Sequence, residues 1–99
     1  MNILYNARDA LLAQQTAEPE ITITIWQEAD CSVLTVQDNA GGIPPHVLPH
    51  IFEPYFTTKG PSQGTGIGLY MAKTMIEHNM GGRLTAGNID NGAEFRIEL

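Results

Sequence analysis

This chain of 99 residues is 42% hydrophobic, and its 11 acidic residues outnumber its 5 lysines and arginines, which gives a formal net charge of −6. A chain of this length can bury about two-thirds of its unfolded surface, enough for a single core, so we expect one compact α/β domain. The acidic balance argues against a nucleic-acid-binding surface, and no run reaches the roughly 18 apolar residues that a membrane helix needs.

The first half of the chain predicts a helix and two strands. Residues 2–15 place Ile3, Leu4, Ala7 and Leu11 on one helical face. Isoleucines that alternate with threonine and tryptophan predict a strand over residues 20–28, which pairs with a second strand at 32–38 across a turn at 29–31. Residues 39–66 are irregular and rich in Gly and Pro, and so long a loop in a small domain is usually functional.

The second half predicts a helix followed by a hairpin. The helix runs from about Gly68 to Asn79, with Gly81 beyond its end. Its expected buried residues are Leu69, Ala72, Met75 and Ile76. Residues 82–88 and 93–99 form the hairpin, in which Phe95, Ile97 and Leu99 share one face.

Three polar residues of the first helix share a face. Asn2, Asn6 and Asp9 are spaced i, i+4 and i+7, roughly opposite the apolar side. A solvated face is one interpretation, but such a face normally carries Glu, Lys or Gln, because Asn and Asp compete with the backbone for hydrogen bonds. The other interpretation is a set of oxygen ligands for Mg²⁺.

The second predicted strand ends in a carboxylate that points inward. Asp38 has the same parity as Leu34 and Val36, so it continues their apolar face. An aspartate before a turn is commonly a cap. Alternatively, Asp38 accepts a hydrogen bond from a ligand N–H, such as the adenine amine, while the small residues of "NAGGIP" let a flat ring approach the backbone.

The stretch "GTGIGL" leaves backbone N–H groups uncovered directly before a helix, an arrangement suited to an anion. It is not a dinucleotide fingerprint, because Leu69 stands where the third glycine belongs, and no Gly-Lys-Ser/Thr of a P-loop follows. The single cysteine, Cys31, indicates a reducing compartment such as the cytoplasm.

Four segments together resemble a known family. "NILYNARDAL", "DNAGGI", "IFEPYFTTK" and "GTGIGL" are similar, in order and spacing, to the N, G1, F and G2 boxes of the ATP-binding catalytic domain of sensor histidine kinases. The resemblance covers nearly the whole chain. It implies a two-layer α/β sandwich, with a mixed sheet of four or five strands and helices on one face.

The resemblance also implies roles for individual residues. Asn6 would be the catalytic Mg²⁺ ligand and Asn2 its neighbour toward the phosphates, while Asp38 would bind the adenine amine. Ile51, Phe52, Pro54, Tyr55 and Phe56 would anchor one end of a lid over the nucleotide. The full expected nucleotide-binding set is Asn2, Asn6, Asp9, Asp38, Gly42, Ile43, Phe56, Thr57, Lys59, Gly64, Thr65, Gly66, Ile67, Gly68 and Leu69.

The chain departs from the family pattern in several places. Ala40 replaces the first glycine of the G1 box, and its small methyl group should be tolerated. Asp9 stands where many histidine kinases carry a lysine that meets phosphate, but an aspartate at this place is common among the nitrogen- and dicarboxylate-sensing kinases. The strand before the N box and the dimerisation domain with its phosphoacceptor histidine are expected to lie outside residues 1–99, so we read the chain as one N-terminally truncated domain with an exposed sheet edge that favours association.

The function implied is that of a histidine kinase in a two-component system, which presents Mg·ATP to a histidine on the dimerisation domain and serves a response regulator indirectly. None of His46, His50 and His78 is followed by the acidic residue typical of an acceptor, so this domain is not expected to phosphorylate itself. The parent kinase could be anchored in the inner membrane. Two alternatives are a protein-serine kinase of the same superfamily and a binding module that has lost catalysis.

Overall fold

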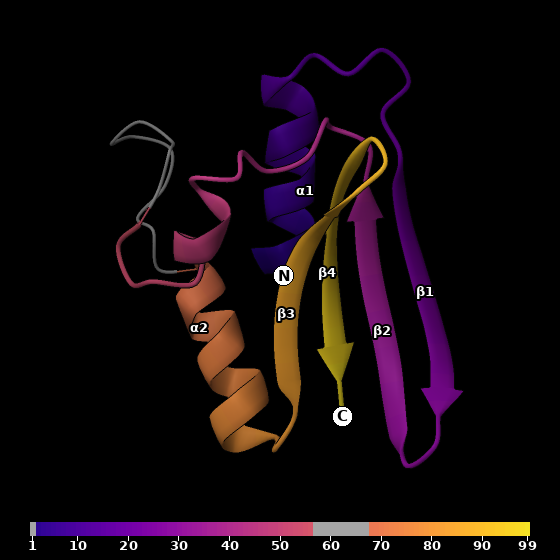
Figure 1. Cartoon of the computed structure of the whole chain (residues 1–99), viewed down its shortest axis with the longest axis vertical. Coiled ribbons are helices and arrows are strands. Elements are labelled where there is room, and N and C mark those ends of the chain that lie inside the picture. Colours follow the sequence, from indigo (N-terminus) through magenta and orange to yellow (C-terminus); the bar gives the residue numbers. More distant parts are fainter. Residues whose placement is uncertain (1, 57–67) are drawn as a thin grey trace.

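The computed structural model describes residues 2–56 and 68–99, with only the backbone described for residue 2. The first half holds helix α1 (Asn2–Ala13), strands β1 (Ile21–Glu28) and β2 (Cys31–Asp38), and the 3-10 helix η1 (Leu48–His50). The second half holds helix α2 (Gly68–Thr74), its π-helical continuation η2 (Met75–Asn79), and strands β3 (Arg83–Ile89) and β4 (Gly92–Glu98). Figure 1 shows these elements in one layer of strands and one of helices.

The four strands form one sheet in the order β1-β2-β4-β3. The β1–β2 hairpin pairs Ile21 with Asp38 at one end and Glu28 with Cys31 at the other. All described pairings are antiparallel, so the parallel pairing expected of a mixed sheet is not found within residues 2–56 and 68–99. The two-layer α/β sandwich with four strands and helices on one face is confirmed.

The core lies between the sheet and the helices. Its buried residues come from every layer: Ile3, Val36, Ile51, Ile76, Leu84 and Phe95. The α1 stripe is confirmed, because Ile3, Ala7 and Leu11 are buried. Since burying one such side chain contributes about 1.5–3 kcal/mol, this cluster is a major source of the stability of the fold.

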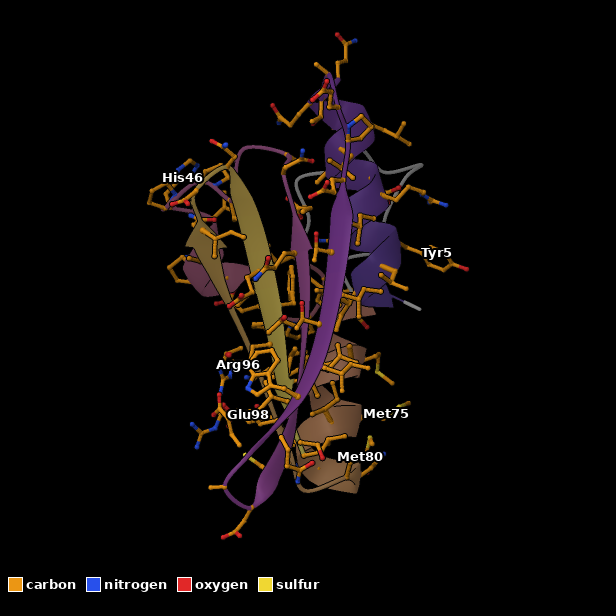
Figure 2. The ribbon with its side chains drawn as sticks, turned by 90° about the vertical axis from the view of Figure 1, so that its right-hand side faces the viewer. Tyr5, His46, Met75, Met80, Arg96 and Glu98 are labelled. Carbon is orange, nitrogen blue, oxygen red and sulfur yellow. The ribbon has the colours of Figure 1, made fainter. Side chains whose placement is uncertain are left out.

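The other sheet face is polar. Figure 2, turned by 90° from Figure 1, shows Arg96 and Glu98 on the side of the sheet away from Met75 and Met80. Arg96 bonds Glu28 across β2 at 3.0 Å and Glu98 on its own strand at 2.8 Å. Charged side chains therefore lie on this face, which also holds Trp26 and the buried Val33, the residue that pairs with both Trp26 and Glu98.

Two predictions about helix faces are wrong. Met75 was expected in the core but is 54% exposed, because it begins the π-helix, whose wider turn changes the direction of successive side chains. Asn6 and Asp9 do not occupy the solvent face of α1, since both are half-buried while Tyr5, Arg8 and Leu12 are exposed. In the described part of the chain, no helix is long and apolar enough to cross a membrane.

Candidate functional site

Asp38 ends β2 as a buried carboxylate on the helix side of the sheet. Its Oδ1 accepts the backbone N–H of Ala40 at 3.0 Å and that of Ala93 at 3.3 Å. The cap interpretation is confirmed, because Oδ1 bonds the turn that follows. Oδ2 receives no hydrogen bond from any residue that the structure describes, which leaves the ligand interpretation open. No buried side-chain oxygen or nitrogen of the described residues lacks a hydrogen-bond partner, so Oδ2 is an atom that solvent reaches, and a ligand N–H could reach it too.

The segment after Asp38 has an open backbone. Gly41 and Gly42 have φ of +95° and +89°, a region that favours glycine. A Cβ on Gly41 would meet nothing within 4 Å, so open space lies beside the loop. Ala40 is buried and is not among the positive-φ residues, so its methyl group is accommodated as expected.

The tip of the β3–β4 hairpin supports this loop. Gly92 is buried against Asp38, and a Cβ built on Gly92 would lie 1.6 Å from the Asp38 carbonyl oxygen. The N–H of Gly41 donates to the Asn91 carbonyl at 2.7 Å, and Asn88 bonds to Ile43. Our reading of the sequence missed these hairpin residues. The sequence feature that could have pointed to them is Asn88, because asparagine is uncommon in strands and its presence in one suggests a specific role for its side chain.

The polar residues of α1 lie beside the core face rather than away from it. Asn6 is half-buried. Asp9 is also half-buried, and its Oδ1 accepts Arg8 Nη2 at 3.0 Å, so its charge is partly balanced within α1. The side chain of Asn2 lies outside the described residues.

The segment before the expected lid is only partly anchored. Phe52 packs edge-to-face on Phe95, with ring centroids 6.2 Å apart, and Ile51 is buried. Phe56 is half-buried near the His50 ring, whereas Tyr55 is 77% exposed and Pro54 is exposed. Six predicted site residues lie outside the described residues: Thr57, Lys59, Gly64, Thr65, Gly66 and Ile67.

The elements that carry the candidate residues meet in one core. Leu69 at the start of α2, Ile43 of the glycine loop and Leu4 of α1 all pack against the central cluster. Gly68 begins α2 directly before Leu69. In the described part of the site, α1 and the start of α2 therefore lie on one side of the sheet, the side to which Asp38 points from the end of β2.

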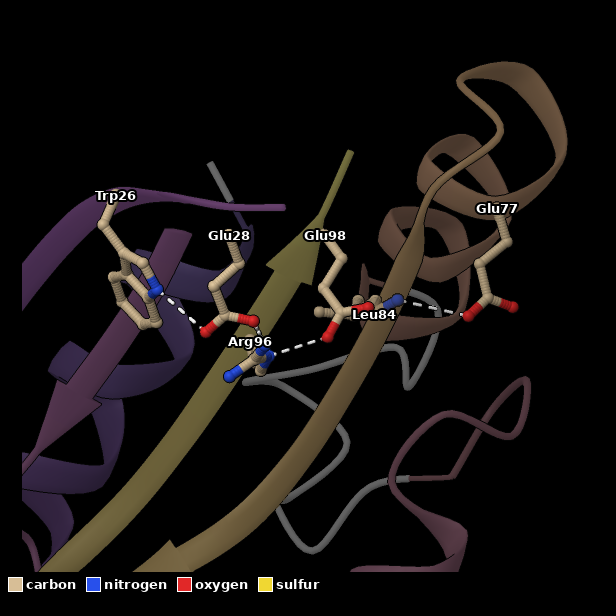
Figure 3. A network of polar contacts seen from close by, with 6 residues as sticks. All are labelled: Trp26, Glu28, Glu77, Leu84, Arg96 and Glu98. Atoms are coloured by element: carbon tan, nitrogen blue, oxygen red, sulfur yellow. Dashed lines mark hydrogen bonds and ion pairs between the residues drawn. The ribbon is translucent and has the colours of Figure 1, made fainter. Parts of the chain in front are cut away.

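A network of charged groups fixes α2 and η2 on the sheet. Glu77 accepts the Leu84 N–H at 3.2 Å and Lys73 Nζ at 3.0 Å, and Lys73 also lies 4.9 Å from the Phe52 ring centroid. The Leu84 N–H, and then Lys73, hold the pKa of Glu77 below its ordinary value of 4.5. Figure 3 shows this contact beside the group on the polar face, where the Trp26 indole N–H, and then Arg96, lower the pKa of Glu28.

The histidines provide no metal site in the described part of the chain. His46 and His50 are four residues apart, a spacing at which two histidines can bind one metal ion. In the structure, however, His50 Nδ1 pairs with Glu53 Oε2 at 2.8 Å. Across residues 2–56 and 68–99, no three His, Cys, Asp or Glu side chains are grouped to hold a metal ion. A divalent cation here would need amide, water or phosphate oxygens.

Comparison with known proteins identifies the family. The family described as "Histidine kinase-, DNA gyrase B-, and HSP90-like ATPase" matches residues 1–99. The chain belongs to this ATPase family. The relatives place it in the histidine-kinase branch: it is 43% identical over 102 residues to the two-component sensor PprA of Pseudomonas aeruginosa and 35% over 100 residues to the histidine-protein kinase AtoS of Escherichia coli K12. All of this chain is covered, but only 11% and 16% of those proteins.

Solved histidine kinases share the fold of this ATPase domain. The mycobacterial sensor histidine kinase MprB matches with a TM-score of 0.78 at 26% identity, over 99% of this chain and 64% of that one. The catalytic domain of histidine kinase ThkA matches with a TM-score of 0.72 at 29% identity, over 97% and 64%. ThkA has also been solved in complex with a response regulator, TrrA, where this chain covers 27% of the kinase at a TM-score of 0.70.

Proposed function

We propose that this domain binds Mg·ATP and positions its γ-phosphoryl group for transfer to a histidine on a separate dimerisation domain of a sensor kinase. In the transfer, a ring nitrogen of that histidine bonds to the γ-phosphorus, the bond to the bridging oxygen breaks, and ADP leaves. Catalysis of this kind depends mostly on positioning and on charge neutralisation. With ATP as its substrate and a response regulator downstream, the domain is proposed to work in the cytoplasm.

The observation that carries the proposal is the environment of Asp38. Two backbone N–H groups hold its Oδ1, so the carboxylate is fixed while Oδ2 remains available to an N–H donor. The adenine amine is such a donor, and the open space beside Gly41 leaves room for a planar base. Hydrogen bonds to a charged acceptor in a buried place are among the stronger ones, so this contact can select the base.

The side-chain amide of Asn6 on α1 is a suitable ligand for Mg²⁺. Asn6 offers a neutral oxygen in a half-buried position, and Mg²⁺ usually combines one or two protein ligands with waters and substrate phosphates. When bound, the ion would neutralise charge on the phosphates. Asp9 belongs to the proposed nucleotide-binding set on the same helix, and the phosphate contacts proposed for Asn2, Lys59 and the "GTGIGL" glycines complete it.

Replacement of Asp38 tests the base-binding role. In Asp38→Asn the amide oxygen can still accept both backbone N–H groups, so the fold should be retained, but the negative charge is lost and an NH₂ group can face the adenine amine. We expect ATP affinity to fall about ten- to a hundredfold. Isothermal titration calorimetry with Mg·ATP measures it.

A matched control is Asp30→Asn, which makes the same charge change in the exposed β1–β2 turn. This variant should bind ATP like the parent. Unchanged ATP affinity in Asp38→Asn, with a normal melting curve by circular dichroism, would refute the base-binding role.

A further inference from the structure

Asn88 joins β3 to the glycine loop through both polar atoms of its amide. Its Oδ1 accepts the backbone N–H of Ile43 at 2.7 Å, and its Nδ2 donates to the backbone carbonyl of the same residue at 2.8 Å. The side chain thus pairs with both backbone groups of one residue 45 positions away. Two bonds from one planar amide fix the orientation of that residue as well as its position.

The loop needs outside support because it cannot provide its own. Residues 40–44 contain no helix or strand, and the two positive-φ glycines lose more conformational freedom on ordering than other residues would. Their partners come from the hairpin: Asn91 holds Gly41, and Asn88 holds Ile43. A Cβ on Gly42 would lie 3.0 Å from Asn88 Oδ1, so the two segments touch closely.

The supported segment is the one proposed to line the base. Asp38 is held at one end by Ala93, and Ile43 at the other end by Asn88, so one hairpin sets the spacing between the carboxylate and the loop backbone. A misplacement of about 1 Å in such a site can cost a hundredfold in function. Since Asn88 lies at the end of the loop away from Asp38, it can change this spacing without changing the carboxylate.

We infer that Asn88 is a positioning residue that sets the selectivity of the site for adenine over guanine. The inference rests on the proposed function, because it takes the base to lie between Asp38 and the loop. A fixed loop rewards the base whose amine reaches Asp38 and rejects one with a carbonyl there. A loosened loop retains phosphate contacts, which are the same for both nucleotides, and loses the discrimination.

The chain contains a matched control in Asn39. Its Oδ1 accepts the Glu20 N–H at 2.9 Å and its Nδ2 donates to the Glu18 carbonyl at 2.8 Å. This is the same two-bond arrangement, but it holds the segment between α1 and β1 and not residues 40–43. Asn39→Ala therefore reports the cost of losing such a clamp for stability alone.

The test measures dissociation constants of Mg·ATP and Mg·GTP for the parent, Asn88→Ala, Asn88→Asp and Asn39→Ala, with melting curves for each. We expect Asn88→Ala to weaken ATP binding about three- to tenfold with little change for GTP, so that the ATP preference falls at least about threefold. Asn88→Asp keeps the acceptor oxygen and loses the N–H donor, so its preference for ATP over GTP should lie between those of the parent and Asn88→Ala. Asn39→Ala should lower the melting temperature and keep the parent preference.

The outcomes separate the two levels of inference. A parent chain that binds ATP through Asp38 with selectivity unchanged in Asn88→Ala overturns the positioning role alone, as does an equal loss of selectivity in Asn39→Ala. If Asn88→Ala does not fold, Asn88→Asp decides in the same way. A parent chain that binds neither nucleotide overturns the proposed function and this inference together, whereas a parent chain that binds both equally overturns this inference alone.

Discussion

Asn6 presents its amide from the half-buried side of α1, and a neutral amide oxygen completes a magnesium shell that phosphates and waters otherwise fill. We expect Asn6→Ala to weaken ATP binding at least about tenfold in the presence of Mg²⁺, the scale of loss seen when a metal site is impaired. Binding in EDTA should change little, because without the ion the amide has no partner in the nucleotide. Calorimetric titrations in the two buffers measure the difference.

A control for this change is Gln14→Ala, which removes an exposed amide just past the end of α1. It should leave both titrations unchanged. An equal loss in Mg²⁺ and in EDTA for Asn6→Ala would show that the residue acts on the fold or on the nucleotide, and not through the metal.

Single residues show where prediction from sequence succeeds and where it stops. The inward direction of Asp38 could be predicted, because strand parity fixes it once Leu34 and Val36 are known to be apolar. Its partner Ala93 could not be, since it lies 55 residues away and periodicity carries no information on which segments meet. Gly92 is similar: the Asn-Gly pair predicts a turn, but only the folded chain shows that a side chain there would collide with Asp38.

At the level of elements, α1, β1 and β2 were predictable because each has one clear period. The second helix was predicted to the correct end, yet its change to π-geometry at Met75 was not, because a single register shift leaves no mark in a 3.6-residue pattern. The N–H of Met80 donates to the Met75 carbonyl at 3.2 Å, the i to i+5 bond of that geometry. The polar face of α1 was misplaced because burial there depends on neighbouring segments.

Glu77 links η2 to β3, and its contribution to stability should depend on pH. The Leu84 N–H and Lys73 lower its pKa in the folded protein below the ordinary 4.5, so the unfolded chain binds a proton at a pH where the folded one does not. Glu77 therefore makes its full contribution to the free energy of unfolding above about pH 4.5. This contribution is lost as the pH falls through the folded-state pKa. Urea denaturation at a series of pH values between 7 and 3 measures this.

In Glu77→Gln the dependence of unfolding free energy on pH should be shallower below pH 4.5 than in the parent. Glu18→Gln, in the exposed segment between α1 and β1, makes the same change away from any ion pair in the described residues and should keep the parent slope. Identical slopes for the parent and Glu77→Gln would contradict the role given to the Leu84 and Lys73 contacts.

For the whole molecule, the family resemblance implied two layers with helices on one face of the sheet, but it did not show how much of that face the helices cover. The helices lie over β2, β4 and β3, and the helix side of β1 is left open. Beside it runs a groove of about 530 Å³, whose apolar lining includes Ile25, Met71, Met75 and Leu99. Alternation predicted the strand and the shared face of its isoleucines, but nothing in a single strand indicates whether a helix reaches that face.

This open edge predicts self-association. β1 is an edge strand with one face of isoleucines, no proline and no lysine, and its charged residue, Glu28, stands at its end. The rest of the strand lacks the proline and the charges that block edge-to-edge pairing. Two copies can pair their β1 strands antiparallel about a two-fold axis, which extends the sheet and places the isoleucines of both copies side by side. We expect the average mass in sedimentation velocity to rise with concentration above the 10.8 kDa of the monomer.

Ile25→Lys should keep the chain monomeric at the same concentrations, because it places a charge in the paired edge. Leu12→Lys is the matched control: Leu12 and Ile25 are both 70% exposed, but Leu12 lies on the outer side of α1. This variant should associate like the parent, since it removes as much exposed apolar surface without touching the edge. A monomeric parent at every concentration, or equal loss of association in both variants, would show that the β1 edge does not drive pairing.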